Sequence, residues 1–135
     1  AEEYDRYNDF VDRNSEARVI APLIDKGIPK GEVLAMVERA GIELPAMYKL
    51  GYDHNNCIGC VKGGMGYWNK IRKDFPEKFK EYADFERTKN YTILKETDGT
   101  PIYLHDLPKN RGRMADEPKI QCGIMCEIAE RSYAA

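Results

Sequence analysis

The stretch Asn55-Asn56-Cys57-Ile58-Gly59-Cys60-Val61-Lys62-Gly63-Gly64 decides the fold, because it carries the first of two cysteine pairs. Two thiols separated by two residues, with Gly59 between them, favour a turn that points both sulfur atoms at one ion. The second pair lies in Cys122-Gly-Ile-Met-Cys126. If that stretch is helical, its two thiols share one face. The chain has four cysteines, so two converging pairs predict a closed four-thiolate metal site formed by Cys57, Cys60, Cys122 and Cys126.

Three other uses of the cysteines stay open at this point. Two disulfides are one, although the sequence shows no secretory signal and cytosolic CxxC pairs more often bind metals or carry out redox chemistry. A redox dithiol and four separate core thiols are the others. For the metal reading, four thiolates give the same total charge around Zn²⁺ and around an oxidised [4Fe-4S] cluster. We predict one Zn²⁺, the usual occupant of a closed Cys₄ site, with a [4Fe-4S] cluster as the alternative.

Composition is that of a globular protein without a strong charge bias. The chain has 135 residues, 42% of them hydrophobic and 33% charged, and a formal net charge of −2. This length predicts a single domain over residues 1–135. Nothing in the overall charge favours nucleic acid or an anionic membrane. No apolar run approaches the length of a membrane span, and no signal peptide is visible, so we expect a cytoplasmic location. The opening Ala-Glu-Glu-Tyr resembles the middle of a helix, from which we expect a fragment of a longer protein.

Apolar periodicity and turn residues predict an α+β fold that is mainly helical, with one short β-hairpin, tied together by the Cys₄ metal site. We expect helices over residues 2–13, 29–40, 65–75, 76–89 and 123–132. A short strand is expected within 18–24, where Pro22 would confine it to an edge or end it. Residues 43–56 are expected to form a loop with one helical turn. Strands at 91–94 and 101–104, joined through Asp98-Gly99, form the expected hairpin, and 105–119 is expected to be a surface loop.

Two of these helices have apolar faces that predict a core. Trp68 and Ile71 are expected to point inward from the helix over 65–75. An apolar face on the following helix comprises Phe79, Tyr82, Ala83 and Phe85.

A basic stretch over residues 62–80 is interleaved with Tyr67 and Trp68. Cations next to aromatic rings could meet the phosphates of a nucleotide or of a nucleic acid, so an alternative function is a metal-stabilised nucleic-acid-binding module. The competing interpretation is a solvated helical face with Trp68 in the core. His54 and His105 are expected to be solvated loop histidines. The cations of the basic stretch are Lys62, Lys70, Arg72, Lys73, Lys78 and Lys80.

Several motifs, taken in order, resemble the C-terminal half of phosphoadenosine phosphosulfate (PAPS) reductase-like proteins. They are the Pro-Leu segment Val19–Asp25, a helix from about Lys30, the run Leu44–Tyr52 with its Pro-x-x-Tyr-x-x-Gly-Tyr pattern, and Ile58-Gly59-Cys60. The run Gly63–Arg72 is similar to a phage and bacterial branch of the group. Together these motifs cover roughly residues 15–126.

The resemblance implies a domain that assists nucleotide-linked sulfur transfer or reduction. Members of the family carry a PP-loop nucleotide-binding domain with the motif Ser-Gly-Gly-x-Asp-Ser, which this chain lacks. The implied partner is therefore such a domain, in cis or in trans, and the chain alone is expected to be inactive. The family's catalytic Cys-Gly-x-His context is also incomplete, because Met125 stands where the His would be. The resemblance further implies that the loop arginines Arg111 and Arg113 contact substrate phosphates.

Overall fold

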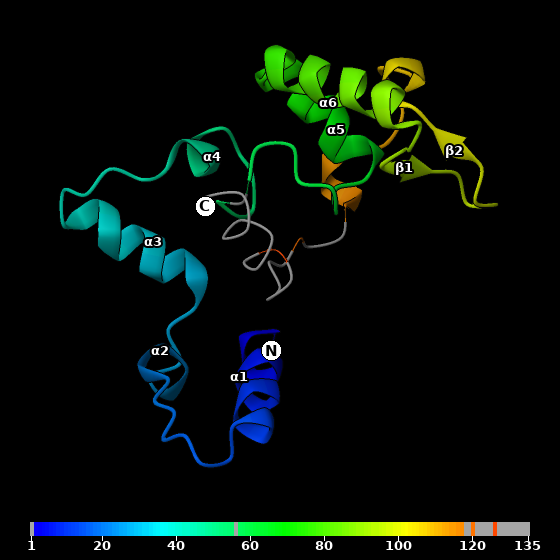
Figure 1. Cartoon of the computed structure of the whole chain (residues 1–135). Coiled ribbons are helices and arrows are strands. Elements are labelled where there is room, and N and C mark those ends of the chain that lie inside the picture. The colour runs from blue at the N-terminus through cyan, green and yellow to red at the C-terminus, as the bar shows by residue number, and fades with distance from the viewer. Residues whose placement is uncertain (1, 56, 118–119, 121–125, 127–135) are drawn as a thin grey trace, which may run out of the picture. The chain divides into compact units, whose positions relative to one another are not determined.

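The computed structural model describes residues 2–55, 57–117, 120 and 126. It is mainly helical with one short two-stranded antiparallel sheet, which confirms the predicted mixture of elements (Figure 1). The sequence predicted a single domain over residues 1–135. The structure groups the residues into two compact units, Ala1–Pro45 and Ala46–Ala135, and each is described by itself below.

The first unit contains helices α1 (Glu2–Arg13), α2 (Pro22–Asp25) and α3 (Lys30–Arg39). The two longer helices confirm the predictions made from their apolar spacing. Helix α3 follows Pro29, whose extended backbone forms the N-cap. It ends where Gly41 adopts a φ of +73° and donates its amide hydrogen to the Glu38 carbonyl. A glycine in this conformation is a common helix stop because it has no Cβ to clash.

The strand expected within residues 18–24 is wrong, because Pro22 begins helix α2 instead of limiting a strand. Proline lacks an N–H group and has a fixed φ, both of which suit the first helical position. The amide hydrogen of Asp25 then bonds to the Ala21 carbonyl at 2.9 Å, and that of Lys26 to the Pro22 carbonyl at 3.2 Å. Gly27, with a φ of +63°, closes this single turn.

No side chain described in the first unit is buried. Large apolar side chains are instead open to solvent, among them Ile20 at 69% exposure and Ile42 at 60%. The hydrophobic core of the described chain lies in the second unit.

The second unit is built on helices α4 (Ala46–Lys49), α5 (Met65–Asp74) and α6 (Pro76–Lys89). Helices α5 and α6 pack against each other, and Pro76 occupies the start of α6 as predicted. Trp68 and Ile71 are completely buried, which confirms their predicted inward orientation. The single helical turn expected within residues 43–56 is α4, and it contributes the buried Met47.

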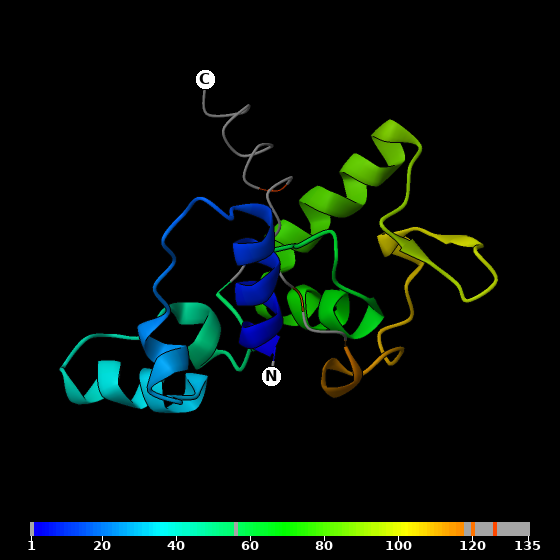
Figure 2. The same cartoon turned by 90° about the horizontal axis from the view of Figure 1, so that it is seen from below.

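The predicted hairpin is present but shorter than expected. Its strands are β1 (Leu94–Lys95) and β2 (Pro101–Ile102), with Leu94 opposite Ile102. Two single 3₁₀ turns, η1 (Leu104–Asp106) and η2 (Met114–Asp116), interrupt the segment expected to be a surface loop. Figure 2 shows α6 leading into this hairpin.

Glu86 on α6 attaches the hairpin segment to the helix. Its side chain is buried, with 2% exposure. One carboxylate oxygen accepts the amide hydrogen of Ile93 at 2.7 Å, and the other accepts that of Leu104 at 2.6 Å. A buried carboxylate needs such donors, because burial removes the hydrogen bonds that water would make.

One residue predicted to lie in the core is exposed. Phe85 was assigned to the apolar face of α6 that forms the core, and this is wrong, because the side chain is 57% exposed. It lies beside Glu86 on a helix whose buried positions are Phe79, Ala83 and Glu86.

The helix expected over residues 123–132 lies outside the described residues, apart from Cys126. In the part of the chain that the structure covers, no helix has the length and apolar character needed to cross a membrane.

Candidate metal centre

The Cys57–Cys60 stretch forms a tight turn just before α5. Gly59 occupies its third position with a φ of +80°, the value that a type II turn requires there and that L side chains rarely adopt. Cys57 is exposed and Cys60 is half-buried, and neither forms a disulfide. A second tight turn follows at once, because the Gly63 amide donates to the Cys60 carbonyl at 3.0 Å.

The hydroxyl group of Tyr67 forms three hydrogen bonds with the backbone of this turn. It accepts the amide hydrogens of Gly59 at 3.1 Å and of Cys60 at 2.9 Å, and it donates its own hydrogen to the Cys57 carbonyl at 3.1 Å. One buried phenol therefore joins the first carbonyl of the turn to its last two amides. Burial raises the pKa of Tyr67 above its ordinary value, so the hydroxyl stays protonated and keeps its role as a donor.

An aromatic cluster supports the turn. The Tyr67 ring stands edge-on to Trp68 with 5.9 Å between ring centroids, and Trp68 stands edge-on to Tyr82 at 5.2 Å. A Cβ atom at Gly59 would lie 2.6 Å from the Tyr82 ring and 3.2 Å from Trp68. Only glycine fits between the turn and these rings. Burial raises the pKa of Tyr82, and the nearby Cys57 and Cys60 contribute to this rise.

Backbone amides near the thiols could have donated hydrogen bonds to metal-bound sulfur atoms, a common supporting arrangement. The structure directs three of them elsewhere. The Gly59 amide donates to Tyr67, the Gly63 amide donates to the Cys60 carbonyl, and the Gly64 amide donates to the Glu117 carboxylate at 2.7 Å. The other oxygen of that carboxylate accepts the Gly66 amide at 2.7 Å. Glu117 thus caps α5, because a carboxylate is stabilising at a helix N-terminus.

The second cysteine pair falls largely outside the described residues. Cys122 is not among them, whereas Cys126 is described as a half-buried thiol without a disulfide. Within the described part of the chain, no group of three or more His, Cys, Asp or Glu side chains could hold a metal ion. The four-thiolate site therefore remains a prediction. The structure places only its first pair, Cys57 and Cys60, which lie on the tight turn before α5.

The cations predicted to bind phosphate have varied surroundings. Lys70 Nζ donates to the Leu50 carbonyl at 2.6 Å and to Asp74 at 2.9 Å. The Arg72 guanidinium donates to two carbonyl oxygens, those of Leu104 at 3.0 Å and Leu107 at 2.9 Å. Arg72 also lies over the Phe79 ring, with 4.4 Å from its central carbon to the ring centroid.

Internal contacts therefore occupy Lys70 and Arg72, and desolvation by burial lowers the pKa of Arg72. Lys62 and Lys73 are exposed. On α6, Lys78 and Lys80 form ion pairs with Glu81 and Asp84 at 2.7 Å each. The exposed and ion-paired lysines are consistent with the competing interpretation of a solvated helical face, with Trp68 buried in the core.

The two loop arginines are exposed and form ion pairs with nearby carboxylates. Arg111 makes a two-pronged contact with Glu96 in the hairpin turn. Arg113 bonds to Asp116 at 2.7 Å. Of the two histidines, His105 is exposed and lies 2.9 Å from Asp84, and His54 is half-buried near the thiol turn in sequence.

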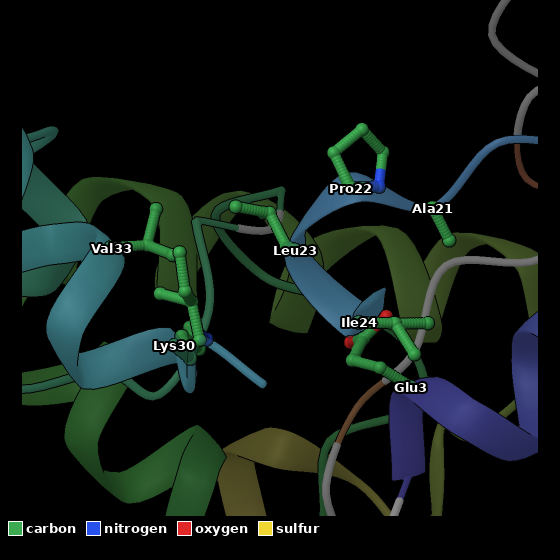
Figure 3. A pocket seen from close by; sticks show the side chains of 8 residues that line it. Glu3, Ala21, Pro22, Leu23, Ile24, Lys30 and Val33 are labelled. Atoms are coloured by element: carbon green, nitrogen blue, oxygen red, sulfur yellow. The ribbon is translucent and has the colours of Figure 1, made fainter. Parts of the chain in front are cut away.

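A separate hollow of about 390 Å³ lies in the first unit, between α2 and α3 (Figure 3). Pro22, Leu23, Ile24 and Val33 line it with apolar side chains, and Glu3 and Lys30 lie at its edge. It contains none of the predicted site residues.

Sequence reasoning found the thiol turn but missed what holds it. Tyr67 was noted as one aromatic residue of the basic stretch, and Glu117 lies in the segment expected to be a surface loop. The tyrosine lies seven residues beyond Cys60 and Glu117 lies 53 residues beyond Gly64, so no local spacing indicates either contact. Comparisons of the chain with models of protein families, with curated proteins and with solved structures found no match.

Proposed function

We propose that this chain is a metal-binding domain in which Cys57 and Cys60 supply two thiolate ligands and Cys122 and Cys126 supply two more. The observation that carries the proposal is the turn held by Tyr67. The glycine conformation and three hydrogen bonds fix the backbone of Cys57 and Cys60 through contacts made within the chain. A fixed turn favours binding because less conformational freedom remains to be lost.

The donor set fits a thiophilic ion. Thiolates select Zn²⁺ and iron–sulfur clusters over hard cations such as Mg²⁺. We propose Zn²⁺, with a [4Fe-4S] cluster as the alternative. A bound ion would cross-link the turn to the C-terminal segment, which stabilises the folded chain because the unfolded chain lacks a formed site.

The wider role proposed for the domain follows from the resemblance to PAPS reductase-like proteins. In this role the domain works with a PP-loop nucleotide-binding domain, in cis or in trans, in nucleotide-linked sulfur transfer or reduction. It supports that chemistry without carrying the nucleotide motif, so the isolated chain is expected to show neither ATP pyrophosphatase nor reductase activity. Activity of the purified 135-residue chain would contradict this part of the proposal.

Metal analysis tests the central claim. We would purify the chain without oxygen, measure zinc, iron and acid-labile sulfide per chain, and record the visible spectrum. One zinc per chain without colour is expected. Iron with sulfide and a brown chromophore would identify the alternative cofactor.

Matched variants then test the ligand set. Cys57→Ser and Cys122→Ser, one from each pair, should each lose most of the bound metal. Ser15→Ala is the control, because Ser15 lies on the surface of the first unit and should leave metal content unchanged. Less than about 0.1 equivalent of any transition metal in the wild-type chain, after reconstitution with Zn²⁺ under reducing conditions, would overturn the proposal.

A further inference from the structure

A cavity of about 520 Å³ opens next to the thiol turn, between α6 and the segment that leads into β1. Its volume is within the range of about 300–1,000 Å³ that is typical of small-molecule sites. The walls come from three parts of the second unit: Val61 after the turn, one face of α6, and the start of the hairpin. The residues that line it are Val61, Tyr82, Phe85, Glu86, Lys89, Tyr91, Thr92, Ile93 and Lys95.

Apolar and aromatic side chains at the cavity are unusually open to solvent. Val61 is 61% exposed, Phe85 57% and Tyr91 70%. Phe85 was expected in the core, and its exposed ring instead forms part of this wall. Aromatic rings presented in this way bind flat apolar groups by stacking and by edge-to-face contact.

The cavity also has a positive charge that the described part of the chain does not neutralise. Within the described residues, neither Lys89 nor Lys95 forms an ion pair, although Lys78, Lys80 and Arg87 on the same helix each have a carboxylate partner. Lys89 Nζ lies 5.7 Å from the centroid of the Phe85 ring, so a cation stands beside an exposed aromatic face.

The carboxylate that lines the cavity belongs to Glu86, against the two ammonium groups of Lys89 and Lys95. Both oxygens of Glu86 are used by the amide hydrogens of Ile93 and Leu104, at 2.7 and 2.6 Å. These two donors hold the carboxylate inside the fold, where its residue is 2% exposed. An anionic ligand in the cavity would meet the ammonium groups of Lys89 and Lys95, which both line it.

We propose that this cavity binds a small aromatic anion, either a carboxylate or a phosphate ester, with its ring against Phe85 and Tyr91 and its charge toward Lys89 and Lys95. The cavity adjoins the proposed metal centre, because Val61 follows Cys60 directly and Tyr82 contacts both the cavity and the turn at Gly59. Ligand binding requires the cavity alone, so it is expected in metal-free protein as well. Failure of either proposal can therefore be recognised separately.

Three probes with the same ring and different head groups test the inference. We would titrate the ¹⁵N-labelled full chain with 1-naphthoate, 1-naphthyl phosphate and neutral 1-naphthalenemethanol, and follow amide chemical shifts. Both anions should shift the amides of Val61, Thr92 and Ile93. The neutral probe should bind at least about fivefold more weakly, which is the effect expected of two partly exposed ion pairs. Comparison of the two anions identifies the preferred head group.

The double variant Lys89→Gln/Lys95→Gln should bind naphthoate about fivefold more weakly and lose the preference over the neutral probe. Its matched control, Lys78→Gln/Lys80→Gln, removes the same charge from α6 outside the cavity and should bind like the wild type. Either of two results would overturn the proposal. One is equal binding of anionic and neutral probes to the wild type, and the other is a set of shifts confined to the hollow around Leu23 and Val33 in the first unit.

Discussion

The Tyr67 hydroxyl offers the sharpest test of how the thiol turn is held. Tyr67→Phe removes one oxygen atom and keeps the ring, which packs 5.9 Å from Trp68 and 6.0 Å from Tyr52. Two amide donors, those of Gly59 and Cys60, then lose their acceptor, and the Cys57 carbonyl loses a donor. The variant therefore probes hydrogen bonding with little change in packing.

The size of the effect follows from burial. Leaving a buried donor without a partner costs about 1–3 kcal/mol. The Gly59–Tyr67 bond is buried and the Cys60–Tyr67 bond is partly buried, so water can replace the second more easily than the first. We expect the free energy of unfolding of the metal-free chain to fall by about 2–4 kcal/mol. Metal affinity should fall by about 10- to 100-fold, as for other groups that orient metal ligands.

Urea unfolding in the presence of a chelator measures the first effect. Its signal is the fluorescence of Trp68, which is the chain's single tryptophan and is completely buried. Zinc competition against a coloured chelator measures the second effect. The control is Tyr82→Phe, from the same aromatic cluster, because the Tyr82 hydroxyl has no hydrogen bond within the described residues. An unfolding midpoint and zinc affinity of Tyr67→Phe equal to those of the wild type would refute the reasoning.

Three further predictions concern the second unit. Gly59→Ala should destabilise the fold by more than about 2 kcal/mol, because the residue has a positive φ and its new Cβ would clash. Gly99→Ala should cost only about 1 kcal/mol, because Gly99 has a φ of +88° but nothing lies within 4 Å of its Cβ. Thermal unfolding of the two variants measures this difference. Glu86→Ala should lower stability by about 2–4 kcal/mol, because two amides lose their acceptor, and hydrogen exchange should become faster at Ile93 and Leu104. Burial alone would raise the pKa of Asp74, but hydrogen bonds from Lys70 and Tyr52 outweigh it and hold the pKa below the ordinary 3.8. The Asp74 carboxylate therefore stabilises the fold above about pH 4, and this contribution is lost as the pH falls through the lower pKa of the folded state. Asp74→Asn should accordingly flatten the acid side of the curve of stability against pH. An unchanged acid side would contradict this prediction.

Local signals account for what the sequence predicted correctly. Pro76 marks the start of α6, Gly41 marks the end of α3, and Asp98-Gly99 marks the hairpin turn. Each signal depends on the backbone preference of one or two residues, which acts wherever the rest of the chain lies. Pro22 carried the same kind of signal, but it was expected to confine a strand to an edge or to end it, although proline also fits at the first position of a helix.

Contacts between distant segments account for what the sequence could not predict. On α5, Arg72 binds carbonyl groups more than 30 positions away, at Leu104 and Leu107. Its placement depends on the complete fold, whereas the sequence offered only a phosphate-binding stretch or a solvated helical face for it. For Phe85 the apolar side chain predicted burial, but the structure leaves it exposed. The neighbouring Glu86 is buried instead, because its carboxylate accepts hydrogen bonds from two amides.

The distribution of amide donors bears on the kind of metal that the turn would hold. Hydrogen bonds from amides withdraw electron density from metal-bound sulfur, and they help to set the potential of iron–sulfur clusters. Here Tyr67, the Cys60 carbonyl and Glu117 use the amides of Gly59, Gly63 and Gly64. These three amides are therefore not available to donate to metal-bound sulfur. Metal binding requires deprotonated thiols, so metal affinity should decline as the pH falls.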